Sequence, residues 1–275
     1  MSGAPSGARP LPPDPRTLGS RLGGVPLVVL LDVDGTLAPI APRPDDARVP
    51  EATAAALRAL AARADTHVGL ISGRGAADAR RLVGVDGVWA VGNHGFARLA
   101  PDGAMQVHEG VEPWAAALAT VRDGARALVE RISGALLEDK GATLSVHYRL
   151  VAEDDAGRLG PEIEGLAAAA GLRVTHGRKV IEVRPPIAVD KGTAVLALAR
   201  ELGAGVPGAS LLFAGDDATD EDAMRALRSW RRDAVTIHVA GEEPRDTVAE
   251  FVADGPPTLA KWLAALAAMP ERGGR

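Results

Sequence analysis

Short apolar runs alternate with amphipathic stretches along most of this chain, a pattern typical of strands that alternate with helices. The first run, 25–32, is almost wholly leucine and valine, as expected for a strand buried on both faces. We predict further strands and intervening helices on the same grounds: strands at 66–71, 88–91, 211–215 and 235–240, and helices at 50–64, 76–82, 191–202, 219–228 and 257–268. This alternation predicts an α/β fold with a doubly wound, Rossmann-like parallel sheet.

The middle of the chain has a different pattern. After a long predicted helix at 113–131, apolar and polar residues alternate strictly over 143–150. A strand there would be apolar on one face and would carry Ser145, His147 and Arg149 on the other. A helix and two consecutive strands are expected next, at 156–170, 172–176 and 179–184. This order predicts a small α+β module.

These patterns divide the chain into three parts. Residues 1–22 are rich in glycine, proline, serine and arginine without periodicity, so we expect a disordered tail. Residues 23–108 and 188–275 are expected to form one core domain, and 109–187 to form a domain inserted into it.

Composition excludes several classes of protein. The formal net charge is −5, which disfavours a protein that binds nucleic acid by neutralising many phosphates. Cysteine is absent, so disulfides, thiolate nucleophiles and cysteine-based zinc sites are excluded. No apolar run reaches the roughly 18 residues of a membrane span, and no signal-peptide pattern opens the chain. We therefore expect a cytoplasmic protein without membrane or nucleic-acid partners, and a monomer.

Two aspartates, Asp32 and Asp34, follow the first predicted strand directly. Ligands of open parallel sheets bind beyond the carboxyl ends of the strands, so this pair is placed for chemistry. Gly35 next to them allows a tight turn. Two carboxylates so close need a cation, or one of them must take up a proton.

A second acidic cluster, 216–222, follows the strand at 211–215 and contains five acids. The helix dipole explains acids in the first turn of the next helix, where Thr219 and Asp222 resemble a capping box. It does not explain Asp216 and Asp217, which precede that helix. Oxygen ligands without histidine or cysteine nearby favour Mg²⁺ over zinc.

Two shorter segments add groups that can hold a phosphate. Ser72, Gly73 and Arg74 follow the strand at 66–71 and offer a hydroxyl, a backbone N–H and a guanidinium. Lys191 begins a helix just after Asp190. Taken alone, the latter pair is also explained by a helix-capping aspartate and a surface lysine. Together with the two acidic clusters, these segments fit phosphoryl transfer through an aspartyl-phosphate.

The four segments, in this order, resemble the motifs of the haloacid dehalogenase-like (HAD) phosphatases. The resemblance implies a HAD core with an inserted cap domain, and Mg²⁺ as cofactor. It implies that Asp32 is the nucleophile, Asp34 the general acid and base, and Lys191 a catalytic and phosphate-binding residue beside Ser72. It further implies metal ligation by the Asp32 side chain, the Asp34 carbonyl and Asp216. Asp217 or Asp220 is expected to support these ligands without binding the metal directly.

A sharper resemblance comes from DVDGTLAPI, ISGR, VGNHG, LEDKGATLSVHYR, KVIEVRP, DKG and GDDATDEDAM, which together are similar to the trehalose-6-phosphate phosphatase family. That family carries a cap, which sets substrate specificity, between the GNHG and KG segments. The resemblance implies that the sugar is bound by Glu138, Lys140 and Glu182, with help from Asn93 and His94. The polar residues His147, Arg149 and Arg184 are candidates for the same task; a solvated strand face would also explain His147 and Arg149.

The expected activity is Mg²⁺-dependent hydrolysis of trehalose 6-phosphate to trehalose and phosphate, with a small sugar phosphate as the partner. A mutase or a phosphatase acting on another sugar phosphate, such as sucrose phosphate, would use the same core. A non-catalytic sugar-phosphate sensor is the alternative from another class; sensors usually lack one of the acids, and all are present here.

Overall fold

The computed structural model describes residues 7–177, 179–241 and 245–271. The chain divides into two compact units, Met1–Met105 with Val189–Arg275, and Gln106–Ala188. The boundaries of the second unit lie within three residues of those expected for the inserted domain. The first unit is called the core below, and the second the cap.

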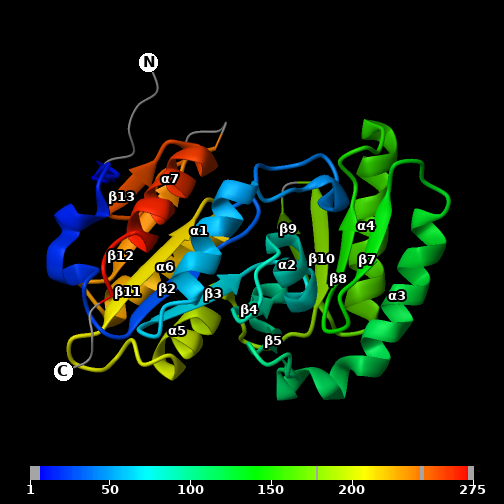
Figure 1. The fold of residues 1–275 in the computed structure, drawn as a ribbon. Helices are drawn as coiled ribbons and strands as arrows, with labels where there is room; N and C mark the ends of the chain where they lie inside the picture. The colour runs from blue at the N-terminus through cyan, green and yellow to red at the C-terminus, as the bar shows by residue number, and fades with distance from the viewer. Residues whose placement is uncertain (1–6, 178, 242–244, 272–275) are drawn as a thin grey trace. The chain divides into compact units, whose positions relative to one another are not determined.

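The core is built on one mixed, mostly parallel sheet (Figure 1). Within the described residues its strand order is β1-β13-β12-β11-β2-β3-β4-β5-β6. The strands are β1 (Arg9–Pro10), β2 (Leu27–Leu31), β3 (Thr66–Ile71), β4 (Trp89–Gly92), β5 (Ala97–Leu99), β6 (Met105–Val107), β11 (Ser210–Gly215), β12 (Val235–Val239) and β13 (Phe251–Ala253). From β1 to β4 the pairing is parallel, and β5 runs antiparallel to β4. This confirms the predicted α/β fold.

Helices cover both faces of the core sheet because its central strands are apolar on both sides. All five residues of β2 are buried. Leu27, Val29 and Leu31 join one apolar cluster, and Val28 and Leu30 join the other. The first cluster takes in α1 (Glu51–Ala61), α2 (Ala76–Val83) and α7 (Gly255–Ala267), and the second takes in α5 (Lys191–Glu201) and α6 (Ala218–Trp230). The result is a three-layered core.

The expected disordered tail is wrong for residues 7–22. β1 pairs in parallel with β13, and the 3₁₀ helix η1 (Pro15–Arg21) follows it. Leu22 is buried in the core, and Arg21 forms an ion pair with Glu250. These partners lie more than 200 residues away in sequence, so a local composition argument could not reveal them. Residues 1–6 lie outside the described residues.

The cap contains an antiparallel sheet in the order β7-β8-β10-β9 over its described residues. Its elements are the 3₁₀ helix η4 (Glu109–Trp114), α3 (Ala115–Val129), β7 (Leu136–Asp139), β8 (Leu144–His147), α4 (Glu153–Ala169), β9 (Arg173–Gly177) and β10 (Val180–Arg184). Both helices pack against strands of this sheet (Figure 1). The apolar residues Leu144 and Val146 of β8 are buried, as are Leu159 and Ile163 of α4.

The sequence patterns located the long elements but missed short ones. Strands β5, β6, β7 and β13 have three or four residues each, too few to show a period of two. The same holds for the short 3₁₀ helices η2 (Pro44–Asp46) and η3 (Asn93–Gly95). β8 ends at His147, so the predicted strand over 143–150 is wrong beyond that residue, where a turn begins.

Candidate active site

Three parallel strands deliver the predicted motifs to one edge of the core sheet. β2 lies between β3 and β11, with Leu31 opposite both Leu70 and Ala214. The segments that follow these strands begin with Asp32, Ser72 and Asp216, so all three emerge at the same edge. The structure therefore brings together chain segments that are far apart in sequence.

A buried lysine lies among the acids. Lys191, the first residue of α5, places its Nζ 2.6 Å from Asp32 Oδ1 and 2.6 Å from Asp220 Oδ1. All three side chains are buried. A buried charge is tolerated only when it is paired, and here one ammonium is shared between two carboxylates.

Burial and crowding change how these acids titrate. Burial raises the pKa of Asp32 to about 8, although Lys191 opposes the shift. Burial also raises the pKa of Asp216 to about 7, with Asp220 and Asp217 adding repulsion between like charges. Burial alone would lower the pKa of Lys191, but Asp220 and Asp32 outweigh it and raise that pKa well above the usual range. The site therefore carries more acids than its single ammonium neutralises.

The acidic cluster fits a hard divalent cation. One carboxylate oxygen from each of Asp32, Asp216 and Asp220 lies within 4.8 Å of the others. Thr36 Oγ1 donates to Asp216 Oδ1 at 3.3 Å. At Gly35, whose φ is +89°, an added Cβ would lie 2.1 Å from Asp216 Oδ2. Only glycine lets the loop approach the cluster so closely.

The two acids expected to support the metal have further contacts of their own. Asp217 is the N-cap of α6, since its Oδ1 accepts from Thr219 N at 2.8 Å and from Asp220 N at 3.0 Å. Asp220 Oδ2 accepts from the backbone N–H groups of Asp216 and Asp217, both at 3.0 Å. The capping box is therefore Asp217 with Asp220, and the expected pair of Thr219 with Asp222 is wrong. The helix begins at Ala218, earlier than the sequence pattern indicated.

The charge of Lys191 and several hydrogen bonds account for the opposite pKa shift of Asp217. Burial by itself would raise the pKa of this carboxyl, but Lys191 and the donors of Thr219 and Asp220 overcome that effect and lower it. The charged form of Asp217 is thus favoured, and this carboxylate fixes the start of α6. In this way it holds Asp220 beside Lys191.

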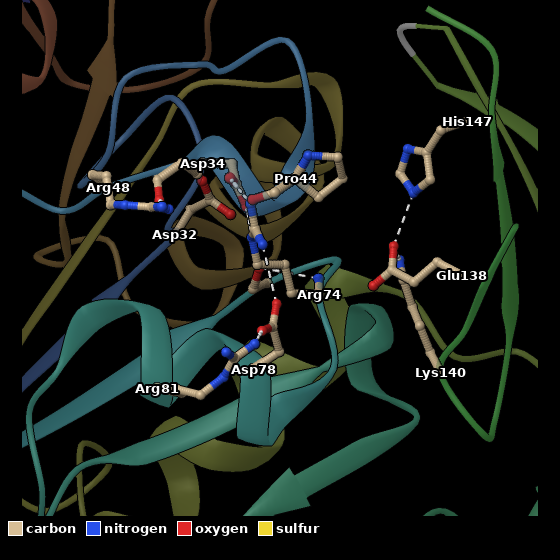
Figure 2. Close-up of polar contacts among 12 residues, drawn as sticks. Asp32, Asp34, Pro44, Arg48, Arg74, Asp78, Arg81, Glu138, Lys140 and His147 are labelled. Atoms are coloured by element: carbon tan, nitrogen blue, oxygen red, sulfur yellow. Dashed lines mark hydrogen bonds and ion pairs between the residues drawn. The ribbon is translucent and has the colours of Figure 1, made fainter. Parts of the chain in front are cut away.

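Arg74 faces Asp34 rather than open solvent (Figure 2). Its Nε and Nη2 donate to the two carboxylate oxygens of Asp34 at 2.7 and 2.8 Å. Nη1 donates to Asp78 Oδ2 at 3.0 Å, and Nη2 also donates to the carbonyl of Pro44 at 2.9 Å. Asp78 and Pro44 were not predicted from the sequence; for Asp78 the available signal was its spacing of four residues from Arg74.

The loop after β4 packs against the loop that carries Ser72. Asn93 N donates to the Arg74 carbonyl at 2.7 Å, and His94 N donates to the Ser72 carbonyl at 3.1 Å. Asn93 and His94 both have positive φ, 53° and 54°. An added Cβ at Gly73 would lie 2.7 Å from His94 Nε2. The expected phosphate-binding residues and this histidine are therefore neighbours in the core.

The cap gathers a second polar cluster on one face of its sheet. Glu138, Ser145 and Glu182 stand opposite one another on β7, β8 and β10. Lys140 Nζ lies 3.8 Å from Glu138 Oε2 and 3.7 Å from Glu182 Oε1. His147 Nε2 lies 2.8 Å from Glu138 Oε2 (Figure 2). These residues are called the cap cluster below.

The remaining two cap candidates lie differently. Arg184 is on the same face of β10 as Glu182 and stands opposite Arg173 of β9. Arg149 is exposed and lies in the turn after β8, so it does not share the strand face of the cap cluster as expected. Ser145 is fully buried between the two glutamates of the cluster.

The trehalose-phosphatase family model matches residues 30–256, which include both the core site and the cap cluster. The chain belongs to the trehalose-phosphatase family. It is 38% identical over 258 residues to a trehalose-phosphate phosphatase of Mycobacterium avium (strain 104), covering 92% of this chain and 65% of that protein. It is 42% identical over 246 residues to an uncharacterized glycosyl hydrolase of Mycobacterium tuberculosis (strain CDC 1551 / Oshkosh), covering 87% of this chain and 18% of that protein. The chain thus spans less than two thirds of these two relatives.

Solved structures have the same fold as this member of the family. A trehalose-6-phosphate phosphatase related protein is 27% identical, with a TM-score of 0.73 over 87% of this chain and 96% of that one. A haloacid dehalogenase-like hydrolase from Bacteroides thetaiotaomicron is 15% identical, with a TM-score of 0.62 over 86% of this chain and 98% of that one. The latter likeness shows the fold alone, and confirms the expected HAD-like core. Of the helices described, none is long and apolar enough to cross a membrane.

Proposed function

We propose that this chain hydrolyses trehalose 6-phosphate to trehalose and inorganic phosphate. The observation that carries the proposal is the group formed by the buried Asp32, Lys191 and Asp220 and the half-buried Asp216 at the carboxyl edge of the core sheet. Membership of the trehalose-phosphatase family supports the choice of substrate. So does the name of the relative from Mycobacterium avium.

In the proposed reaction, a carboxylate oxygen of Asp32 attacks phosphorus, and the ester bond from phosphorus to the sugar oxygen breaks. Asp34 gives its proton to that oxygen, so trehalose leaves as an alcohol. Asp34, now a carboxylate, takes a proton from a water molecule that attacks the aspartyl-phosphate. Inorganic phosphate leaves, and the carboxylate of Asp32 is restored.

Three groups from the core would hold the phosphate during both steps. Lys191 supplies a positive charge next to Asp32, and it is held in place by Asp220. Ser72 supplies a hydroxyl at the end of β3, and Gly73 a backbone N–H. Fixed donors of this kind stabilise the charge of a transferring phosphoryl group without having to reorganise.

Mg²⁺ is the proposed cofactor. The side chains of Asp32 and Asp216 and the carbonyl of Asp34 would hold it, with Asp220 next to them. When bound, the ion neutralises negative charge on the phosphoryl oxygens. The chain's own task is to hold these three acids close together, which Lys191 and the backbone N–H donors of Asp216 and Asp217 assist.

We propose that the cap cluster recognises the sugar. A disaccharide has many hydroxyls and no charge apart from its phosphate, so its recognition needs buried donors and acceptors that only the right sugar satisfies. Glu138, Lys140 and Glu182 supply two acceptors and a donor on one sheet face. His147, Arg149 and Arg184 are proposed as further contacts of the sugar, with Asn93 and His94 of the core.

The test is phosphate release from trehalose 6-phosphate, sucrose 6-phosphate and glucose 6-phosphate, with Mg²⁺ and with EDTA. We expect the highest kcat/KM on trehalose 6-phosphate and no turnover in EDTA. Asp32→Asn should abolish turnover and leave the fold intact. A K140M variant should raise KM for trehalose 6-phosphate about tenfold or more, since the loss of a charged hydrogen bond costs about 1.5–3 kcal/mol.

Other outcomes would favour other functions. A higher kcat/KM on sucrose 6-phosphate would make the chain a phosphatase of a different sugar. Movement of phosphate to another carbon without release would indicate a mutase. Tight binding of trehalose 6-phosphate without turnover would indicate a sensor.

We also propose that the chain acts as a monomer in the cytoplasm. Analytical ultracentrifugation would test the oligomeric state, and cell fractionation would test the location.

A further inference from the structure

The guanidinium of Arg74 has a partner for each of its three nitrogens. Nε and Nη2 form a two-pronged pair with Asp34, Nη1 donates to Asp78, and Nη2 donates also to the Pro44 carbonyl. The Arg74 side chain is only 10% exposed. These bonds use four of the five N–H groups, so a phosphate that met the Nε and Nη2 edge of this guanidinium would have to displace Asp34.

Asp78 and the Pro44 carbonyl anchor Arg74, and Arg74 in turn holds Asp34. Asp78 belongs to the first turn of α2, and Pro44 begins the 3₁₀ helix η2. In the chain, η2 precedes Arg74 and α2 follows it. Their two acceptors fix the plane of the guanidinium. The fork of a guanidinium matches both oxygens of one carboxylate, so a fixed plane fixes the orientation of Asp34 as well.

We propose that Arg74 is a positioning residue that sets the orientation of the Asp34 carboxyl for proton transfer, and is not a ligand of the phosphate. This inference rests on the proposed function, in which Asp34 is the general acid and base. It reassigns Arg74 from the phosphate-binding role that its place after Ser72 and Gly73 suggested. The phosphate is left to Lys191, Ser72 and the Gly73 N–H.

The proposal has a distinctive consequence for leaving groups. When the bond from phosphorus to a sugar oxygen breaks, the electron pair stays on an alkoxide that needs the proton of Asp34. When the substrate is p-nitrophenyl phosphate, the pair stays on a phenolate that is stable without a proton. Misplacing Asp34 should therefore slow the first reaction far more than the second, because general acid catalysis contributes about 10²–10⁴-fold.

The experiment compares R74M with the wild-type chain on trehalose 6-phosphate and p-nitrophenyl phosphate, with inorganic phosphate as inhibitor. We expect kcat/KM to fall about 100-fold or more on the sugar phosphate and less than tenfold on the aryl phosphate. The inhibition constant of phosphate should change less than threefold, whereas S72A should raise it. R74K should recover part of the loss, because a lysine keeps the charge and lacks the fork.

Arg81 offers a matched control. It lies on α2, pairs with Asp78 as Arg74 does, and is 79% exposed (Figure 2). R81M should leave both substrates unaffected. Should R74M fail to fold, D78N serves as the second variant: it removes one anchor of Arg74 and should shift the ratio of the two kcat/KM values in the same direction, about threefold to tenfold.

Several results would overturn the inference. Equal losses on both substrates in R74M, or an unchanged ratio in D78N, would show that Arg74 does not act through Asp34. A tenfold rise in the inhibition constant of phosphate in R74M would make Arg74 a phosphate ligand. Failure of the proposed function would look different, since the wild-type chain itself would then release no phosphate from sugar phosphates, and this inference would fail with it.

Discussion

Lys191 Nζ lies 2.6 Å from Asp32 Oδ1, although 159 positions separate the two residues and the whole cap is inserted between them. The ion pair joins the end of β2 to the start of α5 inside the core. Both side chains are buried, so the contact is protected from screening by salt. It also keeps Asp32, the expected nucleophile, next to Lys191, the group expected to bind the phosphate.

Replacing Lys191 with methionine should destabilise the chain and abolish turnover. The variant leaves Asp32 and Asp220 buried without their shared counter-charge, and breaking a buried ion pair costs about 3–5 kcal/mol. Urea unfolding at pH 7 without metal measures the effect. K261M is the control, since Lys261 is exposed on α7, and it should change stability by less than about 0.5 kcal/mol. Similar stabilities of the two variants would contradict the structure.

The metal-free chain should lose stability as pH rises toward 8. The pKa values of Asp32 and Asp216, about 8 and about 7, lie above the ordinary 3.8. Carboxyls with raised pKa values bind more protons when folded, so their contribution is full below about pH 3.8 and is lost as pH rises through 7 and 8. Thermal unfolding in EDTA from pH 5.5 to 8.5 measures this. D216N should show a weaker decline, and equal declines would refute the assignment.

The same shifts predict how Mg²⁺ affinity depends on pH. A metal replaces the protons that these carboxyls hold, so its binding should release protons below pH 8. Apparent affinity should rise about tenfold per pH unit for each proton displaced. Calorimetry in two buffers of different ionisation enthalpy measures the release. Binding that is independent of pH between 6 and 8 would show that the cluster is already fully ionised.

The N-terminal segment should contribute to stability through Glu250. Hydrogen bonds from Arg21 lower the pKa of Glu250, and Arg9 also pairs with this carboxylate. A lowered pKa means that the stabilisation is present above the ordinary 4.5 and is lost as pH falls through the folded value. E250Q should cost about 1–2 kcal/mol at pH 7, allowing for partial exposure, and less below pH 4.

Glu201 provides the comparison for that experiment. Its ion pair with Arg98 is exposed to solvent, so E201Q should change stability by less than about 0.5 kcal/mol. Urea unfolding at pH 7 and pH 3.5 tests both variants. An E250Q effect as small as that of E201Q would mean that residues 7–22 add little to the core.

Alanine substitutions at two glycines can distinguish the cost of backbone strain from the cost of disturbing the acidic cluster. Gly35 and Gly103 have nearly the same φ, +89° and +92°, but an added Cβ meets Asp216 only at Gly35. G103A should cost about 1–2 kcal/mol from strain alone. G35A should cost more and should also weaken Mg²⁺ binding at least tenfold, because Asp216 must move. Unchanged Mg²⁺ binding in G35A, measured by calorimetry, would contradict the close approach.

The sequence allowed prediction of features that rest on neighbouring residues. The buried run 27–31 and the acids after it needed only a strand and its end, and the structure places Asp32 and Asp216 at one edge accordingly. Contacts between distant segments could not be read in this way. Arg74 follows the serine and glycine that favour a phosphate, but its orientation depends on Pro44 and Asp78, which only the folded chain brings to it.

The strict alternation of the cap strand misled for a related reason. Residues 143–150 alternate throughout, yet pairing with β7 and β10 stops at His147, and Arg149 lies beyond it. A period of two records which face a residue would take if the strand continued. It does not record where the neighbouring strands end.

The pairing of β2 between β3 and β11 has a consequence for synthesis on the ribosome. β2 is translated before the cap, whereas its neighbour β11 (Ser210–Gly215) and Lys191, which pairs with Asp32, are translated after it. A nascent chain therefore carries Asp32, the proposed nucleophile, without its buried counter-charge until the cap has been made. The pair of Asp32 and Lys191 can therefore form only when the segments that follow the cap dock against β2.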